Sequence, residues 1–235
     1  MGGQASGEIA SALAVETVVE HCRAAADEEG APKFCGEPTP GLSDRTNRLA
    51  SAIRLANRTI FESGAKDPAR KGMGATIVAC WIAERRLSLA HVGDSRIYLL
   101  RSGSFDQLTA DHSLVADLVR SGVLTPQQAE VSEQQSILTR ALGTQPAVDV
   151  DADEQLLLVG DVILLCSDGL SRTVTNPEIA STLETNPDPQ KAADRLIELA
   201  NENGGEDNIT AIVVRVMPEP KGFMASLRRW WSGEK

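Results

Sequence analysis

Residues 76–103 read TIVACWIAERRLSLAHVGDSRIYLLRSG, and three apolar runs in this stretch decide the fold class. The runs are TIVACWIA, RLSLAHV and RIYLLRSG, and charged or Gly-containing turns separate them. Short runs rich in β-branched and aliphatic residues, bounded by such turns, are typical of β-strands. The sequence therefore predicts three consecutive strands that form an antiparallel meander.

Two helices are predicted before these strands. Between Ser6 and about Cys22, apolar residues recur at helical spacing. A second helix with one apolar face is predicted from near Ser43 to Gly64. Residues 27–42 contain three prolines and three glycines, so they are predicted to form an irregular loop.

After the meander, helical and apolar patterns alternate. Residues 111–143 are polar and helix-prone, and helices are also predicted at 176–185 and 190–201. The apolar runs EQLLLV and DVILLC meet at Gly160-Asp161, a hairpin signal in reversed order, and NITAIVVRV predicts a buried final strand. Elements in this order favour an α+β fold in which sheets pack together and helices lie outside.

The net charge and the spacing of the cysteines argue against several classes of partner and site. The chain has 23 Lys and Arg against 33 Asp and Glu, a net charge of −10, which makes nucleic acid and anionic lipid unfavourable partners. The four cysteines lack the spacing of a zinc site or a disulfide framework. No apolar run approaches the roughly 18 residues of a membrane span, and the N-terminus does not resemble a secretory leader. We therefore expect a single-domain cytoplasmic protein.

Three apolar strands border turns in which an Asp lies beside Gly, Ser or Asn: AHVGDSR with Asp94, LLCSDGLS with Asp168, and GGEDNIT with Asp207. Each turn alone is explained by backbone geometry. Together they place carboxylates at strand ends of a buried sheet, where an ionised group requires a partner. Because all the candidate ligands are oxygens, they favour Mg²⁺ or Mn²⁺ over zinc. Such ions commonly activate water for phosphate ester hydrolysis.

Several other sites are excluded by their missing residues. DVDADEQLLLVG, from Asp149, resembles the start of an EF-hand loop, but Glu154 stands where that loop needs Gly and Gly160 where it needs Glu. The sequence also contains no G-x-x-x-x-G-K, G-x-S-x-G or H-E-x-x-H motif, which argues against nucleotide-binding, hydrolase-elbow and zincin sites.

Six stretches follow one another along the chain: MGGQASGEIAS, KGMGATIVA, HVGDSRIYLLR, LTRALG, CSDGLS and GGEDNIT. In this order they resemble the metal-dependent protein phosphatases of type 2C, in their bacterial form. The resemblance implies a β-sandwich of two antiparallel sheets flanked by helices, in the order α-β-β-α. It also implies a centre of two Mn²⁺ or Mg²⁺ ions that hydrolyses phosphoserine and phosphothreonine in proteins by attack of a metal-bound water.

The resemblance also assigns site residues. It implies that Asp168 and Asp207 are ligands of the second metal ion and that Asp94 helps to hold a third, weaker ion. Some members carry a further ligand of that third ion four residues after Asp168, but this chain has Arg172 there, which puts the third site in doubt. The resemblance makes residues 114–143 a flap beside the site.

Two polar residues in and near this flap are expected to have structural roles. Arg140, in LTRALG, is expected to pin the flap rather than to act in catalysis. His112, in TADHS, is expected to be a hydrogen-bonding loop residue, while a catalytic role stays open.

The first family motif reads DGMGG, its Asp bridges two ions, and this sequence begins at the Met. The resemblance places an Arg that grips the phosphate and an acidic residue near the first metal further upstream. We therefore expect little or no phosphatase activity from the chain as written, and reduced stability because sheet edges would be open. Residues 1–217 are expected to form the catalytic domain, lacking its N-terminal strands, and 218–235 a basic tail with two Trp residues.

Two other functions remain open. The first is a non-catalytic module of the same fold that binds a partner or a phosphoprotein, although three retained Asp residues are more than a scaffold needs. The second is a myristoylated, membrane-associated protein, because Gly2 and Ser6 fit the pattern M-G-x-x-x-[ST]. On the leading hypothesis, the partners are phosphorylated proteins of a serine/threonine kinase pathway and the chain is a monomer without stable membrane insertion.

Overall fold

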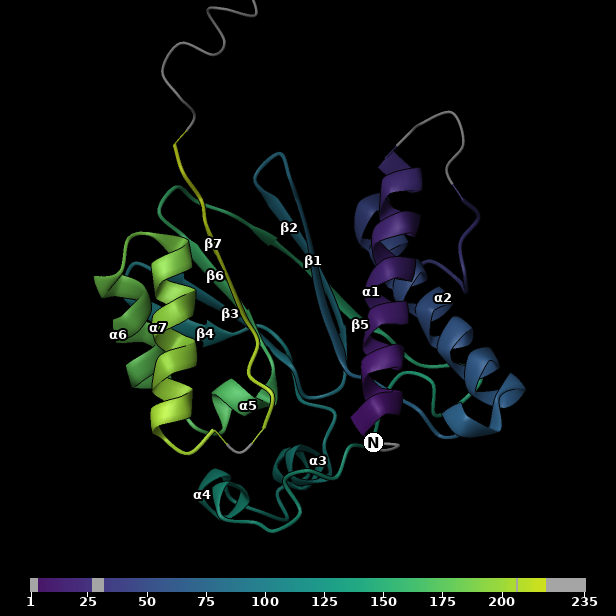
Figure 1. The fold of residues 1–235 in the computed structure, drawn as a ribbon. Coiled ribbons are helices and arrows are strands. Elements are labelled where there is room, and N and C mark those ends of the chain that lie inside the picture. The colour runs from purple at the N-terminus through teal and green to yellow at the C-terminus, as the bar shows by residue number, and fades with distance from the viewer. Residues whose placement is uncertain (1–3, 27–31, 206, 219–235) are drawn as a thin grey trace, which may run out of the picture.

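The computed structural model describes residues 4–26, 32–205 and 207–218, which form two β-sheets between two layers of helices (Figure 1). Helices α1 and α2 cover one sheet, and α6 and α7 cover the other. The layer order is therefore α-β-β-α, and the expected α+β fold with two packed antiparallel sheets is confirmed.

The first helical layer consists of α1 (Gln4–Ala26) and α2 (Asp44–Lys66). The Ser43 side chain accepts the backbone N–H of Thr46 and so caps α2, as expected of an N-cap serine. Both helices agree closely with their predicted ranges. Residues 32–42, the described part of the predicted loop, contain neither helix nor strand.

Each sheet is antiparallel throughout. The first has the order β1-β2-β5, with β1 (Ile77–Ala83), β2 (Arg86–Val92) and β5 (Asp151–Leu156). The second has the order β4-β3-β6-β7, with β4 (Ser104–Gln107), β3 (Arg96–Arg101), β6 (Val162–Cys166) and β7 (Ala211–Arg215).

The predicted three-stranded meander is wrong at its second connection. β1 and β2 form a hairpin, but β3 leaves that sheet and pairs with β4 and β6. The chain changes sheet at Gly93, whose φ of 112° is rare for residues with side chains, and a Cβ there would lie 2.4 Å from Cγ2 of Thr76. An apolar run identifies a strand but not the sheet that it joins, so the pattern could not reveal this change.

The predicted hairpin at Gly160-Asp161 is also wrong. β5 pairs with β2, whereas β6 pairs with β3 and β7. The connection between β5 and β6 therefore carries the chain from the first sheet to the second. Gly160 has a φ of 97°, and its N–H donates to the carbonyl oxygen of Val216 rather than closing a hairpin.

The outer face of the second sheet is covered by α6 (Asn176–Thr185) and α7 (Pro189–Glu202), which confirms both predicted helices (Figure 1). The stretch 111–143 is helical only in α3 (Leu114–Arg120) and α4 (Pro126–Glu130), which lie beside one end of the sheets. Two short elements complete the described fold: a 3₁₀ turn at Pro68–Arg70 and α5 (Asp168–Ser171).

Three apolar clusters hold the layers together. Between α1, α2 and the first sheet lie Ala10, Ala14, Ile53, Ile60, Val92 and their neighbours. Between the sheets lie Leu87, Leu89, Ile97, Leu99, Leu157 and Ile163. Between the second sheet and its helices lie Leu164, Leu170, Ile179, Leu183 and Leu196, among others. Burial of this apolar surface is the main stabilising contribution to the fold.

The final strand is less buried than predicted. β7 is an edge strand of the second sheet, with only β6 as a described neighbour. Its Ile212 is 54% exposed, whereas Val213 packs against the cluster beneath α7. Val214, which shares a face with Ile212, packs against the cluster between the sheets, so β7 is exposed mainly at Ile212.

Two predictions concern residues outside the described part of the chain. Met1–Gly3, the start of the first motif, and residues 219–235, most of the basic tail, are not among the described residues. Within the described ranges, no helix combines the length and the hydrophobicity needed to cross a membrane.

Candidate functional site

Asp168 and Asp207 lie at one end of the second sheet, where β6 ends and β7 begins. The Ser167 hydroxyl donates to the carbonyl oxygen of Asn208 and accepts the N–H of Thr210, both at 3.0 Å. The N–H of Ser167 donates in turn to the carbonyl oxygen of Thr210 at 3.1 Å. These bonds hold the two loops together, so the fold brings two of the predicted ligands to the same sheet edge.

The close approach of these loops depends on Gly169. A Cβ at this position would lie 2.5 Å from the carbonyl oxygen of Asn208 and 3.1 Å from its carbonyl carbon. Backbone atoms cannot rotate away from such a contact as the end of a side chain can. A side chain at residue 169 would therefore push away the loop that carries Asp207.

Asp94 lies on the connection between β2 and β3 and is only 7% exposed. Burial, with the negative charges of Asp168 and Asp111, raises the pKa of Asp94 to about 6 against the opposing effect of Arg172. Desolvation and like charges both disfavour an ionised carboxylate. The ionised form of Asp94 therefore depends on a nearby cation.

Arg172 supplies that cation and joins two of the predicted ligands. Its Nη2 lies 3.1 Å from Oδ2 of Asp94 and 2.9 Å from Oδ2 of Asp168. From the sequence, Arg172 stood out only as a departure from the family pattern. The spacing of four residues between Asp168 and Arg172 was the available signal, because such a pair faces the same side of a helical turn.

Asp207 is exposed, and its Oδ1 accepts the N–H of Asn208 at 2.7 Å. It does not join Asp94 and Asp168 in one compact group. Among the described residues, the set of three potential ligands within 4.8 Å of one another is His91, His112 and Asp151. The predicted ligands thus share one region of the fold, and only two of them are connected through a common partner.

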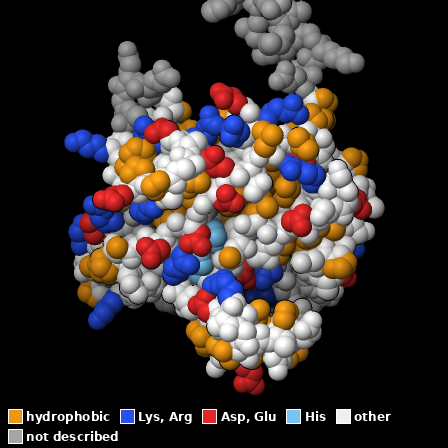
Figure 2. Space-filling view, turned by 180° about the vertical axis from the view of Figure 1, so that it is seen from behind, with side chains coloured by type: hydrophobic (Ala, Val, Ile, Leu, Met, Phe, Trp, Pro, Cys, Tyr) orange, Lys and Arg blue, Asp and Glu red, His pale blue; other side chains and the backbone are white. Residues whose placement is uncertain are grey.

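A cavity of about 580 Å³ adjoins Asp94 and Asp168. One wall of the cavity is formed by Ser113 and by the flap (residues 114–143). The opposite wall is formed by the segment from α5 to the start of α6. Figure 2 shows a hollow in the surface, just above the lobe at the bottom of the view. Acidic and basic side chains lie in this hollow. The flap lies beside the carboxylates, as the resemblance implied.

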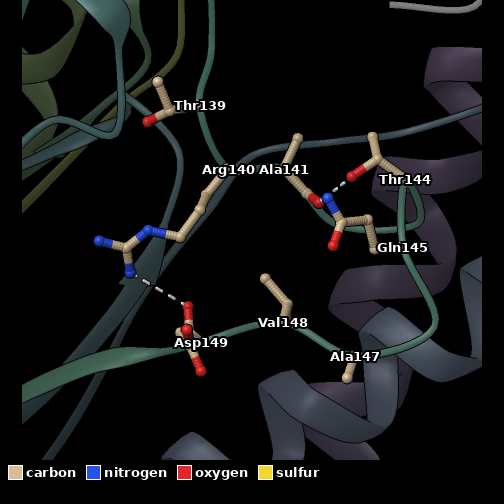
Figure 3. A pocket seen from close by; sticks show the side chains of 8 residues that line it. All are labelled: Thr139, Arg140, Ala141, Thr144, Gln145, Ala147, Val148 and Asp149. Carbon is tan, nitrogen blue, oxygen red and sulfur yellow. Dashed lines mark hydrogen bonds between the residues drawn. The ribbon is translucent and has the colours of Figure 1, made fainter.

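A second cavity, of about 240 Å³, lies along residues 139–149 (Figure 3). At its edge, Nη1 of Arg140 donates to the carbonyl oxygen of Asp149 at 3.3 Å and to Oδ1 of Asp151 at 2.6 Å. These bonds attach the end of the flap to β5. Arg140 thus makes contacts of the kind expected of a residue that pins the flap.

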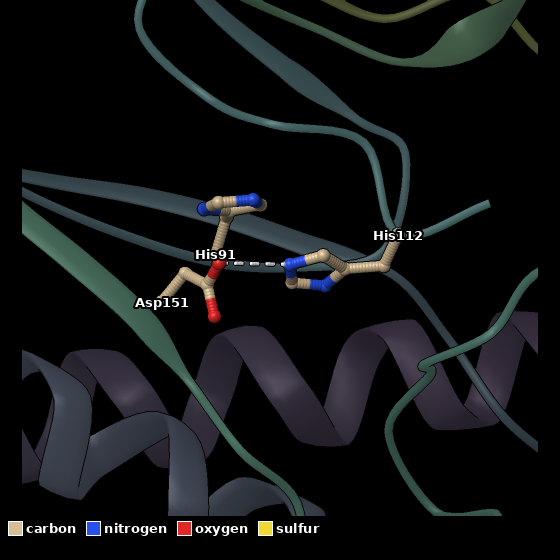
Figure 4. A group of neighbouring side chains, drawn as sticks. All are labelled: His91, His112 and Asp151. Atoms are coloured by element: carbon tan, nitrogen blue, oxygen red, sulfur yellow. Dashed lines mark ion pairs between the residues drawn. The ribbon is translucent and has the colours of Figure 1, made fainter. Parts of the chain in front are cut away.

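His91 and His112 stack with their ring centroids 4.6 Å apart, next to Asp151 (Figure 4). Nδ1 of His112 accepts the N–H of Gly93 at 3.1 Å, so a neutral His112 carries its proton on Nε2. That Nε2 lies 3.2 Å from Oδ2 of Asp151, close enough for an ion-pair contact but not aligned as a hydrogen bond. A histidine that ligates metal through Nε2 needs the opposite arrangement, with the proton on Nδ1. The group does not fit a metal ion.

The histidine pair instead connects loops. The N–H of His112 donates to the carbonyl oxygen of Gly93 at 3.0 Å, which completes a reciprocal pair between these residues. Nε2 of His91 lies 2.9 Å from the carbonyl oxygen of Ala110 and donates to it. Burial lowers the pKa of His112 even though Asp151 opposes this effect. His112 is therefore the hydrogen-bonding loop residue that the sequence favoured.

Comparison with known proteins agrees with this architecture. Residues 1–213 match the family model described as Protein phosphatase 2C. The chain belongs to the protein phosphatase 2C family. The two helix-covered sheets are thus the fold of a protein phosphatase 2C domain.

Two relatives of this protein phosphatase 2C chain come from bacteria. It is 39% identical to the serine/threonine protein phosphatase PstP of Mycobacterium tuberculosis (strain H37Rv) over 217 residues, 92% of this chain and 39% of PstP. It is 32% identical to the protein phosphatase PhpP of Streptococcus pneumoniae (strain R6) over 219 residues, 93% of this chain and 84% of PhpP. The chain thus spans about two fifths of the length of PstP.

Solved structures resemble this protein phosphatase 2C chain over most of its length. A crystal structure of PstP superposes with a TM-score of 0.80 at 37% identity, covering 93% of this chain and 86% of that one. The PstP catalytic domain in complex with two manganese ions gives a TM-score of 0.77 at 37% identity, covering 93% and 85%. Because the sequences are 37% identical, the chain and these structures share a family as well as a fold.

Proposed function

We propose that the chain is the catalytic domain of a metal-dependent protein phosphatase that hydrolyses phosphoserine and phosphothreonine in proteins. The observation that carries this proposal is the joining of the Asp168 and Asp207 loops beside a cavity, in a chain that matches the family over residues 1–213. Its partners would be phosphorylated proteins of a serine/threonine kinase pathway. A monomeric state and a cytoplasmic location remain predictions from the sequence.

Asp168 and Asp207 fit a hard divalent ion by the chemistry of their donor atoms. Carboxylate oxygens are the ligands that Mn²⁺ and Mg²⁺ prefer. Among the described residues, no cationic side chain pairs with Asp207, so its charge is available to an ion. The two manganese ions in the PstP catalytic domain support the same metal here. When bound, such an ion supplies Lewis-acid activation of water and neutralises charge on the phosphate.

The cavity beside these carboxylates would hold the peptide around the phosphorylated residue. Its lining combines the hydroxyl groups of Ser113, Thr173 and Thr175 with the apolar side chains of Val115 and Pro177. Hydroxyl groups can donate to and accept from a peptide backbone, and apolar side chains can cover substrate side chains. We infer that the flap wall contributes to the choice of substrate and excludes bulk water from the reacting phosphate.

The direct test is hydrolysis of a phosphothreonine peptide by the chain, with Mn²⁺ and then with excess EDTA. We expect weak hydrolysis at most; the hydrolysis that is measured should require Mn²⁺ and should fall at least about tenfold in Asp168→Ala and in Asp207→Ala, because each substitution removes a carboxylate ligand. Asp194→Ala is the matched control, since Asp194 is exposed on α7, outside the cavity lining. The measured rate also tests the expectation of weak activity.

The same assay can contradict the proposal. Hydrolysis that continues in EDTA, or that is equal in Asp168→Ala and Asp194→Ala, would exclude a reaction dependent on these ligands. Folded wild-type chain that binds the phosphopeptide without hydrolysing it in Mn²⁺, and that stays inactive when the upstream strands with the Asp of the DGMGG motif are restored, would instead identify a non-catalytic binding module. Circular dichroism of each variant would show that the chains compared are folded.

A further inference from the structure

The guanidinium of Arg172 contacts a third segment besides the two carboxylates. Its Nη2 lies 3.4 Å from the carbonyl oxygen of Gln135, a residue of the flap. Asp94 comes from the connection between β2 and β3, and Asp168 is the first residue of α5. One side chain therefore joins three parts of the chain that are distant in sequence.

The charges around Arg172 explain why a cation is needed there. Asp94 is buried, and Asp168 places a second carboxylate against the same guanidinium nitrogen. The neighbouring Asp111 is already paired with Arg96, through Nε at 3.0 and 3.1 Å and Nη2 at 2.7 Å. Among the described residues, Arg172 is thus the cation that balances both Asp94 and Asp168.

The contact at Gln135 extends into the flap. Nε2 of Gln135 donates to the carbonyl oxygen of Ala129 in α4 at 3.1 Å. At the base of the flap, the N–H of Leu114 donates to the carbonyl oxygen of Ile137 at 2.8 Å. The base is thus closed by backbone bonds, whereas the α4 side is connected to the carboxylates through Gln135 and Arg172.

We propose that Arg172 is an internal cation that replaces a third divalent ion between Asp94 and Asp168 and, through Gln135, ties the flap to the carboxylate site. The third ion that the resemblance implied does not fit here. The guanidinium of Arg172 lies between Asp94 and Asp168, where the third ion would lie. Arg172 also stands at the position where some family members carry a further carboxylate ligand of that ion. Arg172 is a positioning residue, because it sets the place of the flap without having to touch the substrate.

Hydrogen–deuterium exchange of the full chain tests the connection to the flap. In Arg172→Gln, we expect amides of residues 125–137 to exchange at least about threefold faster than in the wild type, because a charged hydrogen-bonding group is lost. Amides of β6 should keep their rates. Arg195→Gln is the matched control, since Arg195 also pairs with two carboxylates, Glu198 and Glu202, but on the exposed face of α7. Unchanged flap exchange in Arg172→Gln would overturn the proposal.

Arg172→Lys provides a second test if the Gln variant does not fold. The ammonium group retains the charge but lacks the planar fork of the guanidinium. We expect this variant to fold. Its flap amides should exchange faster than those of the wild type, but by less than the threefold expected for Arg172→Gln. Wild-type exchange in a folded Arg172→Lys chain would show that the guanidinium does not hold the flap.

Equilibrium dialysis against Mn²⁺ tests the replacement of the ion. Arg172→Asp exchanges the internal cation for a carboxylate, so we expect it to bind one more Mn²⁺ per chain than the wild type. Equal numbers of bound ions in the two chains would overturn the assignment of Arg172 as an internal cation. Neither exchange nor dialysis depends on phosphate hydrolysis, so the result is separate from the outcome of the activity assay.

Discussion

The Asp161 carboxylate accepts two hydrogen bonds from Arg101, with Nε at 2.9 Å from Oδ1 and Nη2 at 2.6 Å from Oδ2. The Asp161 side chain is 3% exposed, whereas that of Arg101 is 31% exposed. Asp161 Oδ2 also accepts the N–H of Leu158, and its carbonyl oxygen accepts the N–H of Val216. This pair therefore holds the connection that carries the chain from the first sheet to the second.

Asp161→Asn should lower the free energy of unfolding by about 2 kcal/mol, because it leaves Arg101 without its charged partner and weakens the bond to Leu158. Urea denaturation at pH 7 measures the effect. Asp153→Asn is the control, since Asp153 is an exposed residue of β5 and its substitution should change stability by less than about 0.5 kcal/mol. Equal stability of the two variants would contradict a structural role for the pair.

The Asp161 pair should also depend on pH. Arg101 and the N–H of Leu158 lower the pKa of Asp161 although burial opposes them. The pair therefore stabilises the fold above the unfolded pKa of about 4, and this contribution is lost as the pH falls through the lowered pKa. The stability difference between wild type and Asp161→Asn should shrink on acidification, and a constant difference down to the acid limit of folding would contradict this.

His112 should make the fold less stable at mildly acidic pH. Burial lowers its pKa, so below about pH 6.5 the unfolded chain takes up a proton that the folded chain does not. Stability that is present above this pH is lost as the pH falls towards the lowered folded pKa. His112→Gln cannot titrate there, so its denaturation midpoint should change less between pH 7.5 and 5. His21, whose pKa is also lowered, is present in both chains and cancels in the comparison.

Gly169→Ala should displace the loop that carries Asp207. Because the added Cβ would meet the Asn208 backbone, we expect a loss of about 1–3 kcal/mol in stability from overpacking. The affinity for Mn²⁺ should fall roughly tenfold or more, since a ligand is moved. Gly72→Ala is the control, because its Cβ would meet nothing within 4 Å and only its positive φ is strained. Calorimetric titration with Mn²⁺ should leave that control unchanged.

Asp207→Asn should separate metal binding from stability. Asp207 is exposed and pairs with no described cation, so the free energy of unfolding without metal should change by less than about 0.5 kcal/mol. The affinity for Mn²⁺ should fall by at least about tenfold. Asp194→Asn on α7 should change neither quantity. A variant with wild-type Mn²⁺ affinity would remove Asp207 from the ligand set.

The sequence by itself determined the features that depend on neighbouring residues. Helical periodicity located α1, α2, α6 and α7, because each helix forms its hydrogen bonds within one segment. Strand runs and turn residues located the main strands, and the acidic turns singled out Asp94, Asp168 and Asp207. The order of these motifs along the chain sufficed to indicate the family before any contact was known.

Only the tertiary structure decided how these elements are joined. The partners of β3 and β6 were misassigned, because a strand's hydrogen bonds are made to other segments and an apolar run fits either sheet. The same reason hid the role of Arg172, whose link to Asp168 is local but whose links to Asp94 and Gln135 span 78 and 37 residues. Contacts between distant segments form only when apolar burial has brought the layers together, so they belong to the fold rather than to any stretch of sequence.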